Sequence, residues 1–184
     1  YIQVMTDAEV TEKNFTAIAV YSNMPQTAKF ECGHSGINQL FSNAVWSMKG
    51  NFLEIPTDCP TRERTGFTGD AQVFVNTGMY LMECYPVYRK FLNELRAVKR
   101  DGGCVSQTAP SGKGHLFDGS AGWSDAIDLI PWRMYLRYGN QDILKENYEK
   151  IKEWLDFSLK RAKEDNPGRV RGKDDKYYSY LLDT

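Results

Sequence analysis

From residue 35 onward, apolar residues recur with the period of an α-helix, and this pattern constrains the fold more than any other feature of the chain. In the first such segment the spacing i, i+3, i+4, i+7, i+8, i+11 is occupied by Ile37, Leu40, Phe41, Ala44, Val45 and Met48. Ser35 is a suitable N-cap for this helix, and Gly50-Asn51 is expected to end it. The segment therefore predicts an amphipathic helix that buries one face against other elements.

Further helical segments follow, separated by proline and glycine. Asp70 can cap a second helix, and Pro86 is expected to begin a third, because the first N–H groups of a helix have no partner to lose. A fourth begins near Ser124, with Pro131 inside it as an expected kink or break, and a last one covers residues 143–159. Four to six helices with several short connections predict a mainly α fold, not alternating strands and helices.

The first part of the chain has a different pattern. Residues 15–21 are a short run of apolar and β-branched residues, and residues 28–32 alternate in polarity, with a turn signal at residues 22–25 between them. Two or three strands cannot bury both of their faces alone, so we expect them to be the end of a β-sandwich. The sequence thus predicts a strand segment at residues 1–33 and a helical domain at residues 34–184.

The balance of charge limits the kinds of partner. The chain has 184 residues, with 23 Lys and Arg against 24 Asp and Glu, which gives a formal net charge of −1. This balance argues against bulk electrostatic binding to nucleic acid or to an anionic membrane surface. No apolar stretch approaches the length of a transmembrane helix, and no signal peptide is visible. Because the chain begins at Tyr1, we expect it to be part of a longer protein, and we make no prediction of location.

Cysteine and histidine are too few and too scattered for most metal or nucleophilic sites. The four cysteines contain no C-x-x-C pair and fit no zinc module, so free thiols are expected. Two histidines supply few bases for a Ser-His-Asp or Cys-His arrangement. The sequence therefore predicts neither a metal nor a cofactor.

The densest group of charged residues lies between the first two predicted helices. Residues 54–70 contain four carboxylates and two arginines, and two prolines and two glycines stiffen the backbone between them. Neighbouring carboxylates disfavour one another's ionisation, so one can stay protonated near neutral pH and act as a general acid while an arginine holds another ionised. Such groups also suit sugar hydroxyls, and Phe67 and Trp123 offer apolar faces for a sugar ring. Spacing alone leaves open a plainer alternative, a capped helix start with a salt-bridged loop.

The order of residues in this loop resembles a known family. The run Asp58-Cys59-Pro60-Thr61-Arg62-Glu63-Arg64-x-Gly66-x-x-Gly69-Asp70-Ala71-Gln72 is similar to the signature of the bacterial α-L-rhamnosidases, glycoside hydrolase family 78. Other segments are similar to the family as well: residues 37–40, 46–52, 122–126, 131–132 and 138–140. The resemblance covers about residues 20–184.

This resemblance implies a fold and a reaction. The implied fold is an (α/α)6 barrel preceded by β-sandwich modules, with this chain as the incomplete first part of the barrel. The implied reaction is inverting hydrolysis of terminal α-L-rhamnosides, so the implied partner is a rhamnose-containing glycoside or polysaccharide. By match to the motif, Glu63 is the general acid, and Asp58 and Asp70 are flanking carboxylates that bind sugar hydroxyls and tune Glu63.

The resemblance also implies roles for three further residues. Arg62 would contact the substrate or hold Asp58, and Trp123 would line the pocket. The family often has tryptophan where this chain has Phe67, which keeps an apolar wall but removes an N–H donor.

One group needed for this reaction is implied to lie elsewhere. Inversion requires a second carboxylate about 6.5–9.5 Å from the acid, to activate water on the opposite face of the sugar. The resemblance places that base beyond this chain, so we expect the remainder of the parent chain to be needed to close the barrel. We also expect this chain alone to bind sugar weakly without turnover. Two alternatives remain open: a non-catalytic carbohydrate-binding fragment, and an (α/α)6 glycosidase that acts on another sugar.

Overall fold

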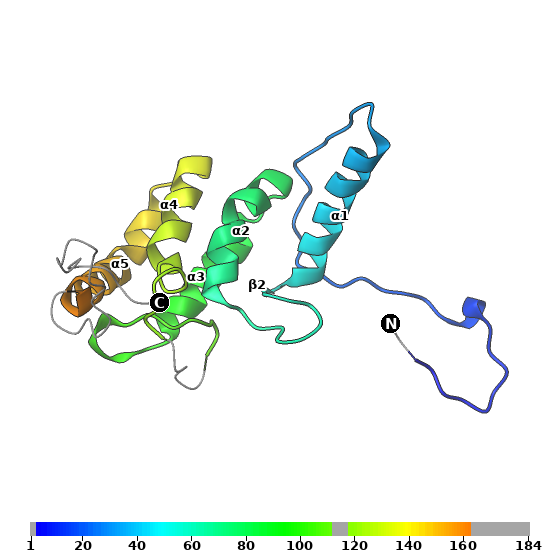
Figure 1. Cartoon of the computed structure of the whole chain (residues 1–184), viewed down its shortest axis with the longest axis horizontal. Helices are drawn as coiled ribbons and strands as arrows, with labels where there is room; N and C mark the ends of the chain where they lie inside the picture. The colour runs from blue at the N-terminus through cyan, green and yellow to red at the C-terminus, as the bar shows by residue number, and fades with distance from the viewer. Residues whose placement is uncertain (1–2, 112–117, 163–184) are drawn as a thin grey trace, which may run out of the picture.

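The computed structural model describes residues 3–111 and 118–162, and within them the fold is mainly helical, as predicted (Figure 1). The long elements are α1 (Ser35–Asn51), α2 (Thr68–Leu81), α3 (Tyr85–Ala97), α4 (Ala126–Tyr138) and α5 (Asp142–Lys160). The short elements are the 3-10 helices η1 (Glu12–Asn14) and η2 (Asp101–Gly103) and the antiparallel strands β1 (Phe52–Leu53) and β2 (Ile55–Pro56). None of the helices in these two ranges combines the length and apolar character of a membrane span.

The core is built where the helices pack side by side. α4 packs against α2 on one side and α5 on the other, and α3 packs against β2, α4 and α5 (Figure 1). The largest fully buried side chains include Tyr88, Phe91, Leu92, Leu95, Ile127, Ile130, Met134 and Trp154. These residues occupy the apolar positions of the helical periodicity, and burying them drives the helices together. The packing brings the residues just before α4 close to the first turns of α2, where Gln72 bonds to Gly122.

Several helix boundaries differ slightly from the sequence-based expectation. α1 begins at Ser35, with His34 and not Ser35 as the flanking cap residue. α2 begins two residues before Asp70, which therefore lies in the first turn of the helix instead of capping it. Pro86 does lie in the first turn of α3, and α4 continues through Pro131 as one helix. α2 starts early because the N–H and the hydroxyl of Thr68 both donate to the backbone carbonyl of Gln107.

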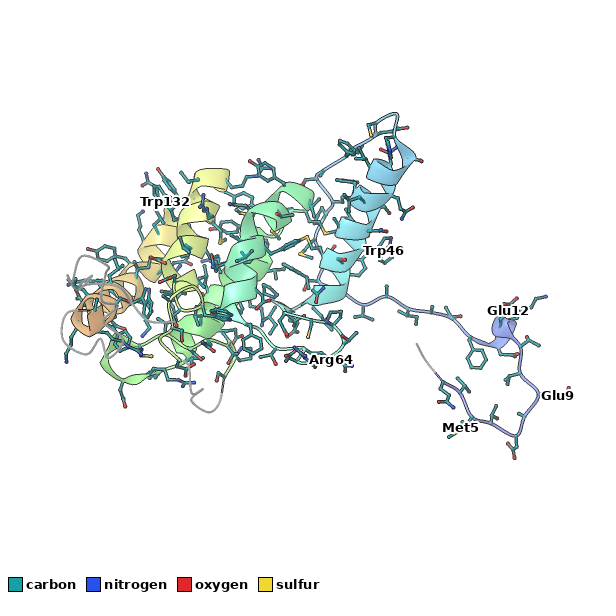
Figure 2. All side chains as sticks on the ribbon, viewed as in Figure 1. Met5, Glu9, Glu12, Trp46, Arg64 and Trp132 are labelled. Carbon is teal, nitrogen blue, oxygen red and sulfur yellow. The ribbon has the colours of Figure 1, made fainter. Side chains whose placement is uncertain are left out.

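The strands predicted at residues 15–21 and 28–32 are not formed within the described residues. Both segments are without helix or strand, and the bridge near them joins Gln26 to Met82. The N-terminal segment, which carries Met5 and Glu9, leads away from the helices (Figure 2). A strand requires the hydrogen-bonding groups of a neighbouring strand, and a local pattern of alternation cannot supply one. The domain boundary at residue 33 stays a prediction.

Candidate active site

Residues 57–67, called the carboxylate loop below, form a closed turn between β2 and α2. The N–H of Asp58 donates to the carbonyl of Thr65 at 3.0 Å, and the N–H of Thr65 donates to Asp58 Oδ1 at 2.9 Å. These two bonds tie the ends of the turn together. Arg64 has a φ of 52°, in the left-handed region that a residue with a side chain adopts only when its surroundings hold it there. The loop therefore presents its carboxylates in defined directions, unlike a flexible linker.

Glu63 is held within this loop by two neighbouring side chains. Arg62 Nη2 lies 2.8 Å from Glu63 Oε1, and the Cys59 thiol donates to Glu63 Oε2 at 2.6 Å. The backbone N–H of Glu63 in turn donates to Cys59 Sγ at 3.2 Å. The hydrogen bond from Arg62, followed by that from Cys59, lowers the pKa of Glu63, because both stabilise the ionised carboxylate.

This lowered pKa differs from the expectation that neighbouring carboxylates raise the pKa of Glu63 and keep it protonated. In the structure the raised pKa belongs to Asp70, where burial is the main cause and the charges of Asp58 and Glu63 add to it. The difference arises because Arg62 and Cys59 both donate to Glu63. Asp70, in the first turn of α2, is affected mainly by desolvation and by like charge.

Asp58 is the most strongly ionised of the three carboxylates. Burial tends to raise its pKa, but interactions with Cys59 and the hydrogen bond from the N–H of Thr65 outweigh it and lower the pKa to about 2. A carboxylate oxygen of Asp58, one of Glu63 and Cys59 Sγ lie within 4.8 Å of one another. By distance alone these atoms could contact one divalent cation. The Cys59 thiol already bonds to Glu63, and Glu63 already pairs with Arg62. We therefore keep the prediction that this site binds no metal.

Arg62 forms its ion pair with Glu63 and not with Asp58, and its other expected role, contact with the substrate, stays a prediction. The negative charge of Asp58 acts on Arg62 only as a weaker, through-space attraction. The Arg62 side chain is 84% exposed. Its guanidinium group is therefore open to a ligand as well as to Glu63.

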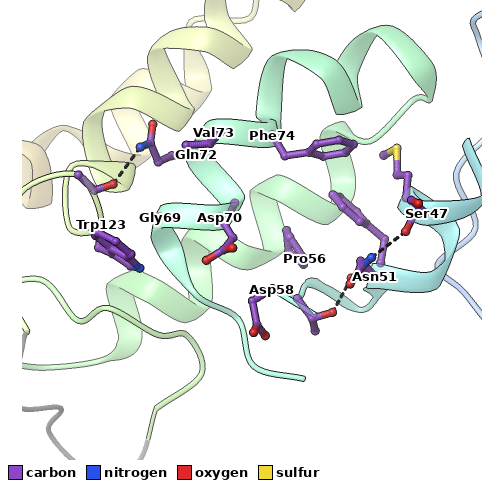
Figure 3. Close-up of a pocket in the computed structure, with 15 residues that line it drawn as sticks. Ser47, Asn51, Pro56, Asp58, Gly69, Asp70, Gln72, Val73, Phe74 and Trp123 are labelled. Carbon is purple, nitrogen blue, oxygen red and sulfur yellow. Dashed lines mark hydrogen bonds between the residues drawn. The ribbon is translucent and has the colours of Figure 1, made fainter. Parts of the chain in front are cut away.

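A cavity of about 530 Å³ opens between α1 and α2, beside the carboxylate loop (Figure 3). Asp58, Asp70 and Trp123 line it, and Figure 3 shows both carboxylates on the same side of α2 as the indole ring. The rest of the wall is largely apolar and includes Met48, Phe52, Pro56, Val73 and Phe74. Three of the six predicted site residues thus meet at one cavity. Glu63 is not part of the wall and lies next to it, against Asp58.

Trp123 is placed by close contact with the first turn of α2. A Cβ atom at Gly69 would lie 2.7 Å from Trp123 Nε1, so only glycine allows the indole to approach this closely. Gln72 Nε2 donates to the carbonyl of Gly122 at 2.8 Å and fixes the segment that carries the ring (Figure 3). The Trp123 side chain is 41% exposed, so part of the ring is open to a ligand.

Phe67 lies at the start of α2 and is not part of the cavity wall. It forms a backbone bridge with Thr108, and the next residue, Thr68, donates through its N–H and its hydroxyl to the carbonyl of Gln107 at 2.8 and 3.0 Å. The half-buried Phe67 therefore belongs to the junction between the loop and residues 105–109. The structure does not bring it to the cavity with Trp123.

Cys59 is the residue of this site that sequence reasoning missed. Free thiols were expected, and all four cysteines are free, but Cys59 lies half-buried against the side chain and backbone of Glu63. The only signal in the sequence was its position directly after Asp58 in the motif.

Comparisons with known proteins identify the family to which this chain is similar. The family model of the bacterial alpha-L-rhamnosidase 6 hairpin glycosidase domain matches residues 25–181. An alpha-L-rhamnosidase of Formosa agariphila is 41% identical to this chain over 154 residues, which are 81% of this chain and 16% of that protein. Two solved structures are similar in fold and in sequence. That of the Streptomyces avermitilis alpha-L-rhamnosidase complexed with L-rhamnose has a TM-score of 0.73 and 37% identity, covering 78% of this chain and 14% of that chain.

The second solved structure is that of the native alpha-L-rhamnosidase of Aspergillus terreus, with a TM-score of 0.75 and 33% identity, covering 92% of this chain and 19% of that chain. This chain therefore spans less than a fifth of the length of these relatives. The predicted first part of an (α/α)6 barrel is confirmed by the six-hairpin description of the matched domain. By sequence and by fold, the chain belongs to the family of bacterial α-L-rhamnosidase six-hairpin glycosidase domains.

Proposed function

We propose that the full-length protein carrying this domain hydrolyses terminal α-L-rhamnosides with inversion, and that Glu63 donates the proton to the departing oxygen. One observation carries this proposal: Asp58 and Asp70 line a cavity beside Trp123, and Glu63 adjoins Asp58. A sugar can place its hydroxyls on the two carboxylates and its C–H face against the indole. The relatives described above are alpha-L-rhamnosidases, which favours rhamnose as that sugar.

In this proposal the three carboxylates have different tasks. Asp58, whose pKa is lowered to about 2, is a permanent hydrogen-bond acceptor for hydroxyl groups. Asp70, whose pKa is raised by burial and by its neighbours, can accept or donate depending on its protonation. When ionised, each places negative charge beside the bond that breaks, where an oxocarbenium-like transition state develops positive charge.

Glu63 must be protonated to act as the acid, although its pKa is lowered in the structure. Its side chain is 34% exposed, so water still stabilises the ionised form. A bound sugar would remove this water and, by desolvation, raise the pKa of Glu63. The arriving sugar also provides alternative hydrogen-bond partners for Arg62, whose bond to Glu63 is the main cause of the lowered pKa. We assign the general base to a carboxylate outside this chain.

The test is a hydrolysis assay on the full-length protein, followed by ¹H NMR. The expected result is cleavage of methyl α-L-rhamnoside with β-L-rhamnose as the first sugar product, before mutarotation. A first product with the α configuration would contradict inversion. Saturable binding of L-rhamnose without cleavage would instead favour a carbohydrate-binding role. Cleavage of a different glycoside in a panel of 4-nitrophenyl sugars would move the assignment to another sugar.

A further inference from the structure

We infer that Cys59 is a positioning residue for Glu63, with a thiol that fixes the direction of the carboxyl group. The inference rests on the proposed function, in which that carboxyl is the general acid. It adds a residue that acts through Glu63, and Cys59 itself touches neither the substrate nor the bond that breaks.

The contacts between the two residues are reciprocal. The Cys59 thiol donates to Glu63 Oε2 at 2.6 Å, and Cys59 Sγ accepts the backbone N–H of Glu63 at 3.2 Å. The carbonyl of Cys59 also accepts the N–H of Arg64 at 3.2 Å. One residue thus holds the side chain of Glu63, its backbone and the next peptide unit. This arrangement restricts the rotation of Glu63 about its side-chain bonds, which is what a proton donor of fixed direction requires.

The other groups that face Glu63 cannot replace this contact. Arg62 donates to the other carboxylate oxygen, but its long side chain is 84% exposed and free to follow solvent or a ligand. Asp58, in the same loop, also contacts the carboxyl group of Glu63 and raises its pKa, but its own pKa of about 2 leaves it without a proton to donate. Asp70, on α2, interacts with Glu63 only through charge. Cys59 is short and half-buried, so it is the inner anchor of the carboxyl group.

The contact also predicts a direction for the pH dependence. A donor to an ionised carboxylate lowers its pKa, so removing the thiol raises the pKa of Glu63. A general acid works in its protonated form, and activity is lost as the pH rises through its pKa. Removal of the thiol therefore moves the alkaline limb of the profile of kcat/KM against pH to higher pH, even though the rate itself falls.

The experiment compares Cys59→Ala and Cys59→Ser in the full-length protein, with methyl α-L-rhamnoside as substrate. For Cys59→Ala we expect kcat to fall about tenfold, which corresponds to the loss of one hydrogen bond to a charged group. We also expect the alkaline limb of the kcat/KM profile to move to higher pH by about one pH unit. Cys59→Ser keeps an O–H donor, so it should retain most of the wild-type kcat and most of the wild-type pH profile. Cys32→Ala is the matched control, a half-buried free cysteine elsewhere in the chain, and should change neither quantity. An active wild type whose Cys59→Ala variant keeps its kcat and its pH profile would overturn the inference.

A second measurement decides the inference even if the wild type proves inactive on rhamnosides, an outcome that would refute only the proposed function. Iodoacetamide alkylates Cys59 when its thiolate forms a bond to the methylene carbon and iodide leaves, and mass spectrometry gives the rate. A glutamine amide is a weaker hydrogen-bond acceptor than a carboxylate, so Glu63→Gln should loosen the contact that covers the sulfur and speed this alkylation several-fold at fixed pH. Glu149→Gln, an exposed glutamate on α5, should leave the rate unchanged. An equal rate in wild type and Glu63→Gln would show that the two side chains are not in contact.

Discussion

Glu63→Gln in the full-length protein is expected to lower kcat on methyl α-L-rhamnoside by about 10²- to 10⁴-fold, the range attributed to general acid catalysis. Glutamine has the size and shape of glutamate but cannot deliver an acidic proton to the departing methoxide. The affinity for L-rhamnose should change little, because Asp58 and Asp70, the carboxylates that we propose bind its hydroxyls, stay in place. Steady-state kinetics and calorimetry with L-rhamnose measure the two effects separately.

The choice of leaving group makes this test specific for proton donation. 4-Nitrophenolate departs with little help from an acid, so Glu63→Gln should impair 4-nitrophenyl α-L-rhamnoside much less than the methyl glycoside. Glu149→Gln serves as the control, because this glutamate is exposed on α5 away from the carboxylate loop. An equal loss on both substrates would assign Glu63 to substrate binding, and no loss on either would remove it from the mechanism.

Asp118→Ala is expected to destabilise the domain by about 3–5 kcal/mol, the usual cost of breaking a largely buried ion pair from one side. Asp118 Oδ2 lies 2.6 Å from Arg100 Nε, with side chains that are only 8% and 16% exposed. Its other oxygen accepts the N–H of Gln107 at 2.9 Å. The carbonyl of Gln107 in turn accepts hydrogen bonds from the N–H and the hydroxyl of Thr68 at the start of α2. The substitution should therefore loosen the helix turn that carries Asp70 as well as lower stability.

Thermal unfolding of the full-length protein and hydrogen exchange followed by mass spectrometry can check both parts of this prediction. Exchange should increase in peptides that cover residues 66–70 and 105–109, and the unfolding temperature should fall. Asp142→Ala is the matched control, because its ion pair with Lys145 leaves both side chains about 70% exposed and should be worth less than about 1 kcal/mol. Unchanged exchange in both peptides would mean that Asp118 does not hold the start of α2.

The helices of this domain were predictable because their signal is local. Apolar residues spaced three and four apart lie on one face of a helix, whatever else the chain does, and α1 and α3 follow that spacing. The start of α2 was placed too late, since Thr68 bonds to Gln107, 39 residues further along the chain. The strands expected at residues 15–21 and 28–32 are not formed in the described part of the chain for a related reason, because a strand needs a partner.

The candidate site was predictable only as a set of residues. The motif brought together Asp58, Glu63 and Asp70, and two of the three line one cavity with Trp123. It did not indicate which carboxyl has the raised pKa, since that depends on which groups donate to each oxygen. It also did not reveal that Cys59 holds Glu63.

The sequence by itself determined the family of this chain, the positions of most helices and the residues from which the site is made, because periodicity and motif order are carried by neighbours along the chain. Tertiary structure alone decided that Thr68 bonds to Gln107, that desolvation raises the pKa of Asp70, and that the ring of Trp123 lies against Gly69. Hydrogen bonds, desolvation and close packing act over a few ångströms of space, and the distances that set their strength exist only once distant segments have come together.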